Sequence, residues 1–289
     1  MVGPRAPGRT PTVALATASA FADDIGGEEL LVDALAERGA VPTWVPWDDP
    51  SADWATFDLV VVRTTWDYPD RLDAFRAWVR QVAVTTVLVN PARLMLGNLH
   101  KSYVADMGDL AVPTLVVPAG MTVDLGHVPW PDVVVKPAVG VGGNGAVRHA
   151  SQADLDALTL ADEGADAVVQ PYLAAVERSG EASVVCIEGE PTHAVRKRPA
   201  SGEFRIHAHR GGTTEPVPVT EELADIARRT LATLPARPAY ARVDMIHDGA
   251  TWRVVELELV EPYLYLEHAP RVAGLLAEGL LARVGATVR

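Results

Sequence analysis

The sequence VVVKPAVGVGGNG, residues 133–145, sets the class of fold, because a strand runs there into a glycine-rich loop. Three valines predict a buried strand that ends at Lys136, and glycines follow from residue 140. Glycine lets backbone N–H groups approach phosphate oxygens closely, and a lysine supplies a positive charge to a polyphosphate. The spacing matches neither a Walker A loop nor a GxGxxG turn. This stretch alone leaves two interpretations open, a phosphate-binding loop and a hairpin turn with surplus glycines.

Carboxylates follow on later strands. Asp244 lies in RVDMI, residues 242–246, and Glu256 and Glu258 alternate in VVELELV, residues 254–260. Because side chains alternate along a strand, both glutamates share one face. Two like charges side by side are unfavourable unless something neutralises them, and hard oxygen ligands suit Mg²⁺ that bridges phosphates. The alternative is a solvated strand face, which the apolar neighbours disfavour.

Before the central stretch, strands and helices alternate. Apolar runs predict strands at 13–16, 41–45, 59–62 and 87–89, with helices at 27–38 and around Phe75, Trp78 and Val79. This is a βαβ pattern with a parallel sheet, and ligands bind at the carboxyl ends of such strands. Arg63 and Asp67, in RTTWDY at 63–68, follow one of these ends. We expect them to bind substrate, with Arg63 on a carboxylate; the alternative is a turn whose Trp and Tyr simply pack.

Composition narrows the class of partner. The 289 residues carry a formal net charge of -13, which argues against binding to nucleic acid or an anionic membrane surface. Small molecules are the expected partners, and a homodimer is compatible with the acidic surface. Cys186 is the only cysteine, so an internal disulfide and a cysteine metal cluster are excluded, and a cytoplasmic location is expected.

In order and spacing, these segments resemble the ATP-grasp superfamily, and in particular its bacterial glutathione synthetase and ribosomal-protein glutamate ligase branch. The resemblance covers about residues 95–267, and its most specific part consists of QPYL (170–173), GE (180–181), GEP (189–191), RKRP (196–199), GEFR (202–205), GG (211–212) and EP (215–216). It implies an α/β protein with a Rossmann-like N-terminal domain at 1–98. Two α+β subdomains at 99–173 and 174–289 are expected to clasp ATP.

The resemblance also assigns roles by position. The implied site residues are Lys101 and Lys136 on the ATP phosphates, Gly142 and Gly143 in the phosphate-covering loop, Gln170 and Leu173 at adenine, Glu181 on the ribose, Lys197 and Arg205 on the transferred phosphoryl group, and Asp244, Glu256 and Glu258 on Mg²⁺. The sequence departs from the family at Glu258, where asparagine is usual. The number of Mg²⁺ ions therefore stays open.

A narrower similarity concerns ELELVEP (256–262) and RTTWDY (63–68), which look like the subgroup containing the cyclo-ligase of the cycloserine pathway. The implied activity is an ADP-forming carboxylate–amine ligase that acts through an acyl phosphate on an amino-acid-like molecule. The glycine loop is then expected to be a lid that excludes water from the acyl phosphate. An ATP-grasp phosphotransferase and an inactive nucleotide-binding regulator remain as alternatives. The sequence leaves open the carboxylate, the amine, whether both lie in one molecule, and the oligomeric state.

Overall fold

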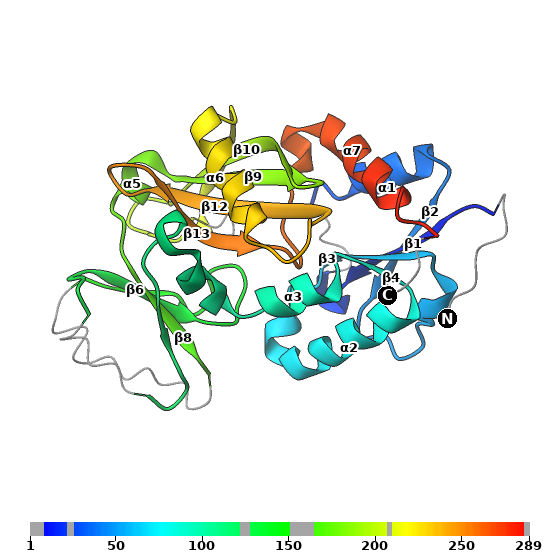
Figure 1. Ribbon diagram of the computed structural model, residues 1–289, viewed down its shortest axis with the longest axis horizontal. Helices are drawn as coiled ribbons and strands as arrows, with labels where there is room; N and C mark the ends of the chain where they lie inside the picture. The colour runs from blue at the N-terminus through cyan, green and yellow to red at the C-terminus, as the bar shows by residue number, and fades with distance from the viewer. Residues whose placement is uncertain (1–8, 22–25, 122–127, 151–164, 207–209, 286–289) are drawn as a thin grey trace.

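The computed structural model describes residues 9–21, 26–121, 128–150, 165–206 and 210–285. Its strands form three sheets, which Figure 1 shows as a parallel sheet beside two antiparallel ones. This mixed architecture confirms the predicted fold class. None of the helices in these ranges is both long and apolar enough to cross a membrane.

The first sheet has the order β2-β1-β3-β4, with every pair parallel. Its strands are β1 (Thr12–Thr17), β2 (Val41–Pro46), β3 (Leu59–Thr64) and β4 (Val87–Val89). The central strands are near-continuous apolar runs because both faces of the sheet are covered. The strand order changes direction between β1 and β3, which is where α/β sheets open a crevice for ligands.

Helices from both ends of the chain cover this first sheet. Leu59 and Val61 of β3 pack with α1 (Glu29–Glu37) and α7 (Pro270–Leu281) in one core cluster. Val60 and Val62, on the opposite face, pack with α2 (Leu72–Thr85) in another. Figure 1 shows α7, in red, lying beside α1. The sheet comes from residues within 1–98, but the helix that completes its cover comes from the end of the chain.

The second sheet has the order β5-β8-β6-β7 and is antiparallel. Its strands are β5 (Leu115–Val117), β6 (Val133–Pro137), β7 (Val147–His149) and β8 (Ala167–Pro171). Before it, α3 (Ala92–Asn98) and the 3-10 segment η4 (Lys101–Leu110) lead out of the first sheet. All four strands fall within 99–173.

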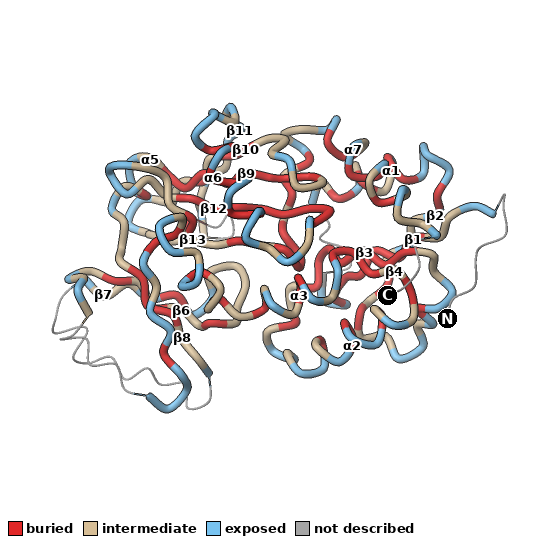
Figure 2. The backbone as a smooth tube through the Cα atoms, viewed as in Figure 1, coloured by how far each residue is buried: buried red, intermediate tan, exposed pale blue. Residues whose placement is uncertain are grey.

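The third sheet has the order β11-β10-β9-β12-β13 and is also antiparallel. Its elements are α5 (Ala175–Ser179), β9 (Glu181–Ile187), β10 (Glu190–Arg198), β11 (Thr213–Val217), α6 (Glu221–Ala232), β12 (Tyr240–His247) and β13 (Trp252–Glu258). Apolar residues of β9, β12 and β13 pack with α6 on one face. The central strands are among the most deeply buried segments in Figure 2. The opposite face carries the polar residues of the site described next.

Candidate active site

A cavity of about 1020 Å³ lies where the three sheets meet. Each sheet contributes to its wall: Trp66 and Tyr68 follow β3, Lys136 and Gln170 lie on β6 and β8, and the third sheet supplies charged residues. A volume of this size at a domain junction is typical of a ligand site. Of the residues expected from the sequence, the wall includes Lys101, Lys136, Gly142, Gly143, Gln170, Leu173, Glu181, Lys197, Arg205, Asp244, Glu256 and Glu258.

Two lysines lie close to the glycine loop. The Lys101 Nζ donates a hydrogen bond to the carbonyl oxygen of Gly140 at 2.6 Å and forms an ion pair with Glu256 at 3.1 Å. Burial lowers the pKa of Lys136, and Lys101 adds to the effect, although Glu256 opposes it. Phosphate oxygens at this position would supply the negative charge that two lysines beside one glutamate require.

The loop after β6 has a backbone that only glycine adopts easily. Gly142 and Gly143 have φ values of 62° and 67°, in the left-handed region. The loop is attached at both ends, because Lys101 holds Gly140 and the Arg210 guanidinium donates to the side-chain oxygen of Asn144 at 3.1 Å. This geometry presents backbone N–H groups and small residues at the edge of the cavity.

Gln170 and Leu173 lie at the end of β8, where the chain leaves the second sheet. The Gln170 side chain donates to the hydroxyl of Thr114 at 2.9 Å, which fixes its orientation. Because β8 ends at Pro171, the residues that follow it leave the ladder. A strand end of this kind offers backbone donors and acceptors to the edge of a flat ring.

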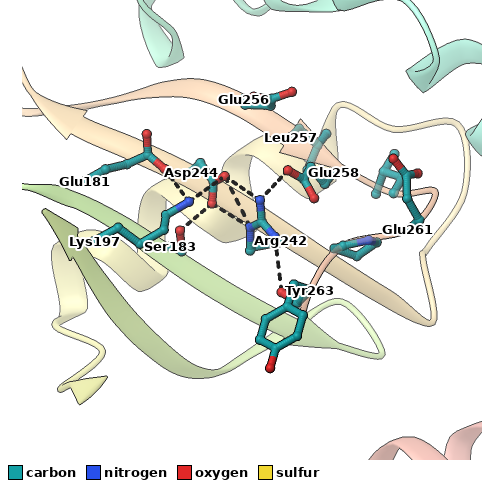
Figure 3. A network of polar contacts seen from close by, with 12 residues as sticks. Glu181, Ser183, Lys197, Arg242, Asp244, Glu256, Leu257, Glu258, Glu261 and Tyr263 are labelled. Carbon is teal, nitrogen blue, oxygen red and sulfur yellow. Dashed lines mark hydrogen bonds and ion pairs between the residues drawn. The ribbon is translucent and has the colours of Figure 1, made fainter. Parts of the chain in front are cut away.

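Charged side chains of the third sheet form one connected network, shown in Figure 3. The Lys197 Nζ lies 2.6 Å from Glu181 and 3.2 Å from Asp244. The Arg242 guanidinium donates to both oxygens of Asp244 and also pairs with Glu258. Ser183 donates its hydroxyl to Asp244 at 2.6 Å. Negative and positive side chains therefore alternate along the chain of contacts from Glu181 through Lys197, Asp244 and Arg242 to Glu258.

Burial and charge act in opposite directions on these groups. Burial raises the pKa values of Glu181 and Glu258 to about 7, with Lys197 and Arg242 opposing the effect. Burial also acts against ionisation of Asp244, but Arg242 and Lys197 hold its pKa below the usual range. For Lys197, the cost of burial is outweighed by Asp244 and Glu181, which raise its pKa. Perturbed titrations of this kind are typical of functional sites.

Asp244 and Glu256 face each other across the β12–β13 ladder, and Arg242 is paired with Glu258. Their oxygens are suitable donors for Mg²⁺. Within the described ranges, however, no three Asp, Glu, His or Cys side chains are grouped to hold a metal ion by themselves. Each of the three carboxylates already has a cationic partner, Arg242 for Asp244 and Glu258 and Lys101 for Glu256, and the role of Asp244 as a metal ligand stays a prediction. The arrangement fits a cation held jointly by Glu256, Glu258 and nucleotide phosphates, which would supply the remaining oxygens.

The two residues expected to bind substrate lie outside the cavity wall. Arg63 is 1% exposed; its Nε donates to Glu28 at 2.8 Å and an Nη to the carbonyl oxygen of Pro262 at 2.9 Å. Asp67 accepts from the indole of Trp47 at 2.8 Å and pairs with Arg71. Arg63 is therefore a buried residue paired with Glu28, while one of its guanidinium nitrogens, Nη1, has no hydrogen-bond partner among the described residues. Of the RTTWDY segment, Trp66 and Tyr68 reach the cavity.

Arg242 and Glu261 are among the cavity residues that the sequence prediction missed. Arg242 lies two positions before Asp244 on β12, so period-two alternation alone could have placed it on the same face. Glu261 follows the end of β13, where alternation no longer applies. Its position depends on Trp66, whose indole donates to the Glu261 carbonyl oxygen at 3.2 Å. No local pattern in the sequence indicates that contact.

Two family models match the chain. The model described as the D-cycloserine synthetase DcsG N-terminal domain matches residues 13–90. The model described as the prokaryotic glutathione synthetase ATP-grasp domain matches residues 100–260, which carry most of the cavity wall.

Individual proteins agree with these models. The cycloserine biosynthesis protein DcsG of Streptomyces lavendulae is 29% identical over 277 residues, which cover 86% of this chain and 92% of that protein. A glutathione synthetase of Mesorhizobium japonicum is 27% identical over 205 residues, 69% of this chain and 65% of the relative. The crystal structure of D-cycloserine synthetase DcsG superposes with a TM-score of 0.84 at 27% identity, covering 94% of this chain and 99% of that one. A D-alanine–D-alanine ligase from Bacillus anthracis shares the fold, with a TM-score of 0.67 at 13% identity and coverage of 96% and 97%.

Proposed function

The chain belongs to the prokaryotic glutathione synthetase ATP-grasp family, and on this premise we propose that it is an ADP-forming ligase that activates an amino-acid-like carboxylate as an acyl phosphate. An amine then attacks the acyl phosphate, which forms a C–N bond and releases phosphate. The observation that carries the proposal is the cavity itself. It brings Lys101, Lys136, Lys197 and the carboxylates of β13 into one enclosure.

ATP is proposed to lie along the second sheet. Gln170 and Leu173 form the adenine end, while Lys101, Lys136 and the loop at Gly142 bind the phosphates. The partly buried Lys136 supports this placement, because a lysine with a lowered pKa gains most from nearby phosphate charge. Glu256 and Glu258 would hold Mg²⁺, and the ion would supply positive charge to neutralise the polyphosphate.

Three cations are proposed to face the transferred phosphoryl group. Lys197 and Arg242 are already oriented by Asp244, and Arg205 is held by Glu203 at 2.7 Å. Phosphoryl transfer needs positioning and charge neutralisation more than a nucleophile from the protein. Side chains fixed before substrate binds cost little reorganisation during the reaction, so this preformed network suits transfer to a carboxylate.

The carboxylate and the amine are proposed to belong to a small molecule bound between Trp66, Tyr68 and β13. The relatives with matching N-terminal domains are proteins of cycloserine formation, which supports a ring closure within one amino-acid-derived molecule. Joining two separate molecules, as the names of the other relatives suggest, is the competing form of the same chemistry.

The test is release of ADP and phosphate from Mg-ATP in the presence of amino acids, small peptides and aminooxy acids, each with and without a second amine. Release that depends on one carboxylate, together with a condensed product by mass spectrometry, supports the ligase. The matched variant Lys197→Met should lower kcat by about a hundredfold or more, because it removes a cation from the transferred group. A stable phosphorylated product would identify a phosphotransferase, and nucleotide binding without turnover would identify a regulator.

A further inference from the structure

Glu261 is a carboxylate in the cavity wall whose charge has no local counterpart. Its side chain is 8% exposed and lines the cavity. Among the described residues, no hydrogen bond or ion pair reaches its carboxylate, and in Figure 3 no dashed line ends on it, whereas Asp244 and Glu258 are joined to cations. A buried carboxylate without a partner costs free energy, so a site that retains one gains by binding a positive group.

The neighbouring cations are committed elsewhere. Lys101 is bound to Gly140 and Glu256, and Arg242 is bound to Asp244 and Glu258. Burial raises the pKa of Glu261 to about 8, with Glu258 adding to the effect, and the opposing influence of Lys101 and Arg242 does not cancel it. A cationic group of a bound ligand would therefore favour the ionised form of Glu261, which no described side chain of the protein pairs with.

The backbone around Glu261 is held rigidly. The indole of Trp66 donates to the Glu261 carbonyl oxygen at 3.2 Å, and Arg63 donates to that of Pro262 at 2.9 Å. Arg63 is in turn fixed by Glu28 at 2.8 Å. Fixing two consecutive carbonyl groups holds the backbone of Glu261, and with it the Cα atom, at the wall of the cavity. The buried Arg63–Glu28 pair thus supports the backbone segment that carries Glu261.

Aromatic rings lie beside this carboxylate. Trp66 and Tyr68 both line the cavity, and the hydroxyl of Tyr68 has its pKa raised first by burial and then by Glu261, which indicates that the two groups are close. A carboxylate next to aromatic rings is a setting that attracts an ammonium group. Glu267 also lines the cavity, but its side chain is 39% exposed and contacts His268 and Tyr263.

We infer that Glu261 binds the ammonium group of the substrate, so that the enzyme selects a small zwitterionic amino acid over the corresponding hydroxy acid. This inference rests on the proposed function and names its substrate class. Lys197 and Arg242 line the same cavity as Glu261, so they are the cations available to the substrate carboxylate when the ammonium lies on Glu261. Glu261 is then a specificity-determining residue.

The experiment measures binding separately from turnover. Wild type, Glu261→Gln and Glu37→Gln are loaded with Mg²⁺ and the non-hydrolysable analogue AMP-PNP and titrated by calorimetry with D- and L-alanine, D- and L-serine, and the matching lactates and glycerates. Glu37 is exposed on α1, so it controls for the loss of one charge. We expect wild type and Glu37→Gln to bind at least one amino acid about tenfold or more tighter than its hydroxy acid, and Glu261→Gln to lose this preference.

Three results would overturn the inference: unchanged discrimination in Glu261→Gln, no binding of any amino acid to wild type, or a Glu261→Gln variant with lower kcat but the same Kd, which would indicate proton transfer instead. Retained AMP-PNP binding shows that the variant is folded. ADP release, measured on the same panel, separates the two proposals. ADP release with hydroxy acids alone would support the ligase proposal and reject the ammonium site at Glu261. Glu261-dependent binding without any ADP release would support the ammonium site and reject the ligase proposal.

Discussion

At the scale of single residues, Arg63 shows what the sequence could and could not predict. The apolar run before it placed Arg63 correctly at the carboxyl end of β3. Its partner, Glu28, lies in the turn before α1, and no spacing rule connects residues 28 and 63. The structure shows a buried ion pair that the sequence did not predict, and the contact of Arg63 with substrate stays a prediction. Arg242 differs, because its alternation with Asp244 was visible in the sequence.

Breaking the Arg63–Glu28 pair should strongly destabilise the protein. Arg63→Met leaves Glu28, which is 2% exposed, without its counterion, and the loss of one partner of a buried pair costs about 3–5 kcal/mol. Urea denaturation followed by intrinsic fluorescence measures the change. The double variant Glu28→Leu/Arg63→Met should recover most of the loss, because it removes both charges. A single variant as stable as wild type would contradict the assignment.

The stability of the nucleotide-free protein should depend on pH through Glu261. Its pKa is raised from 4.5 to about 8, so between these values the folded state holds a proton that the unfolded state has released. The contribution of Glu261 to stability is therefore full below about pH 4.5 and declines as the pH rises to about 8. Relative to wild type, Glu261→Gln should gain on the order of a few kcal/mol between pH 5 and pH 8.

Urea unfolding in EDTA at pH 5, 6, 7, 8 and 9 measures this difference. Glu37→Gln, which removes an exposed carboxylate from α1, serves as the control and should track wild type at every pH. The free energies of unfolding of Glu261→Gln and wild type could instead differ by the same amount at every pH. In that case, Glu261 would not have the raised pKa on which this prediction rests.

At the scale of elements, the glycine loop after β6 is the part that we expect to respond to nucleotide. The strand at 133–135 and the succession of glycines were readable from the sequence, but the contacts that attach the loop were not. Lys101 bonds to Gly140, which is 39 residues away in the sequence, and Arg210 bonds to Asn144, which is 66 residues away. Similarly, the alternation of residues in β13 predicted that Glu256 and Glu258 lie on one face of the strand. The sequence pattern did not predict the irregularity between Asp244 and Met245, where the register of the β12–β13 ladder shifts.

Adding one methyl group to this loop should weaken nucleotide binding. Gly142 has φ 62°, where an L-residue costs roughly 1–2 kcal/mol, so Gly142→Ala should raise the Kd for AMP-PNP by about fivefold to thirtyfold. Gly120→Ala is the matched control, because Gly120 has φ 74° and lies outside the cavity wall. Proteinase K digestion adds a second measurement, in which AMP-PNP should protect the loop of wild type more than that of Gly142→Ala. Equal protection with and without nucleotide would count against a lid.

At the scale of the whole molecule, each of the three sheets is built from one continuous part of the sequence. The last helix, α7, instead packs against the first sheet, which is formed by the beginning of the sequence. The apolar spacing of α7 indicates a buried face without indicating what it covers. In the structure, Leu276 and Leu280 pack with Leu31 and Leu35 of α1 over the first sheet. Contacts between the two ends of a chain are set by tertiary packing, which local patterns do not encode.

Removal of α7 should therefore destabilise the first sheet, together with Val185 and Ile187 of β9 that share its core cluster. A chain that stops at Ala269 loses Val272, Leu276 and Leu280 from the core, at roughly 1.5–3 kcal/mol each. That sum is a large part of the stability of a typical domain. Hydrogen exchange read by mass spectrometry should show lost protection in β1 and β3. A chain that stops at Gly285 keeps α7 and should behave as wild type.

The position of α7 also bears on how the protein is made. The ribosome delivers β1, β3 and α1 early, yet the cover on one face of their sheet, to which α1 contributes, stays incomplete until residues 270–281 have left the exit tunnel. Through most of synthesis, Leu31 and Leu35 have no permanent cover, and this is a surface that trigger-factor-type chaperones can occupy. Pausing translation late in the message should therefore lower the yield of native protein more than pausing it early.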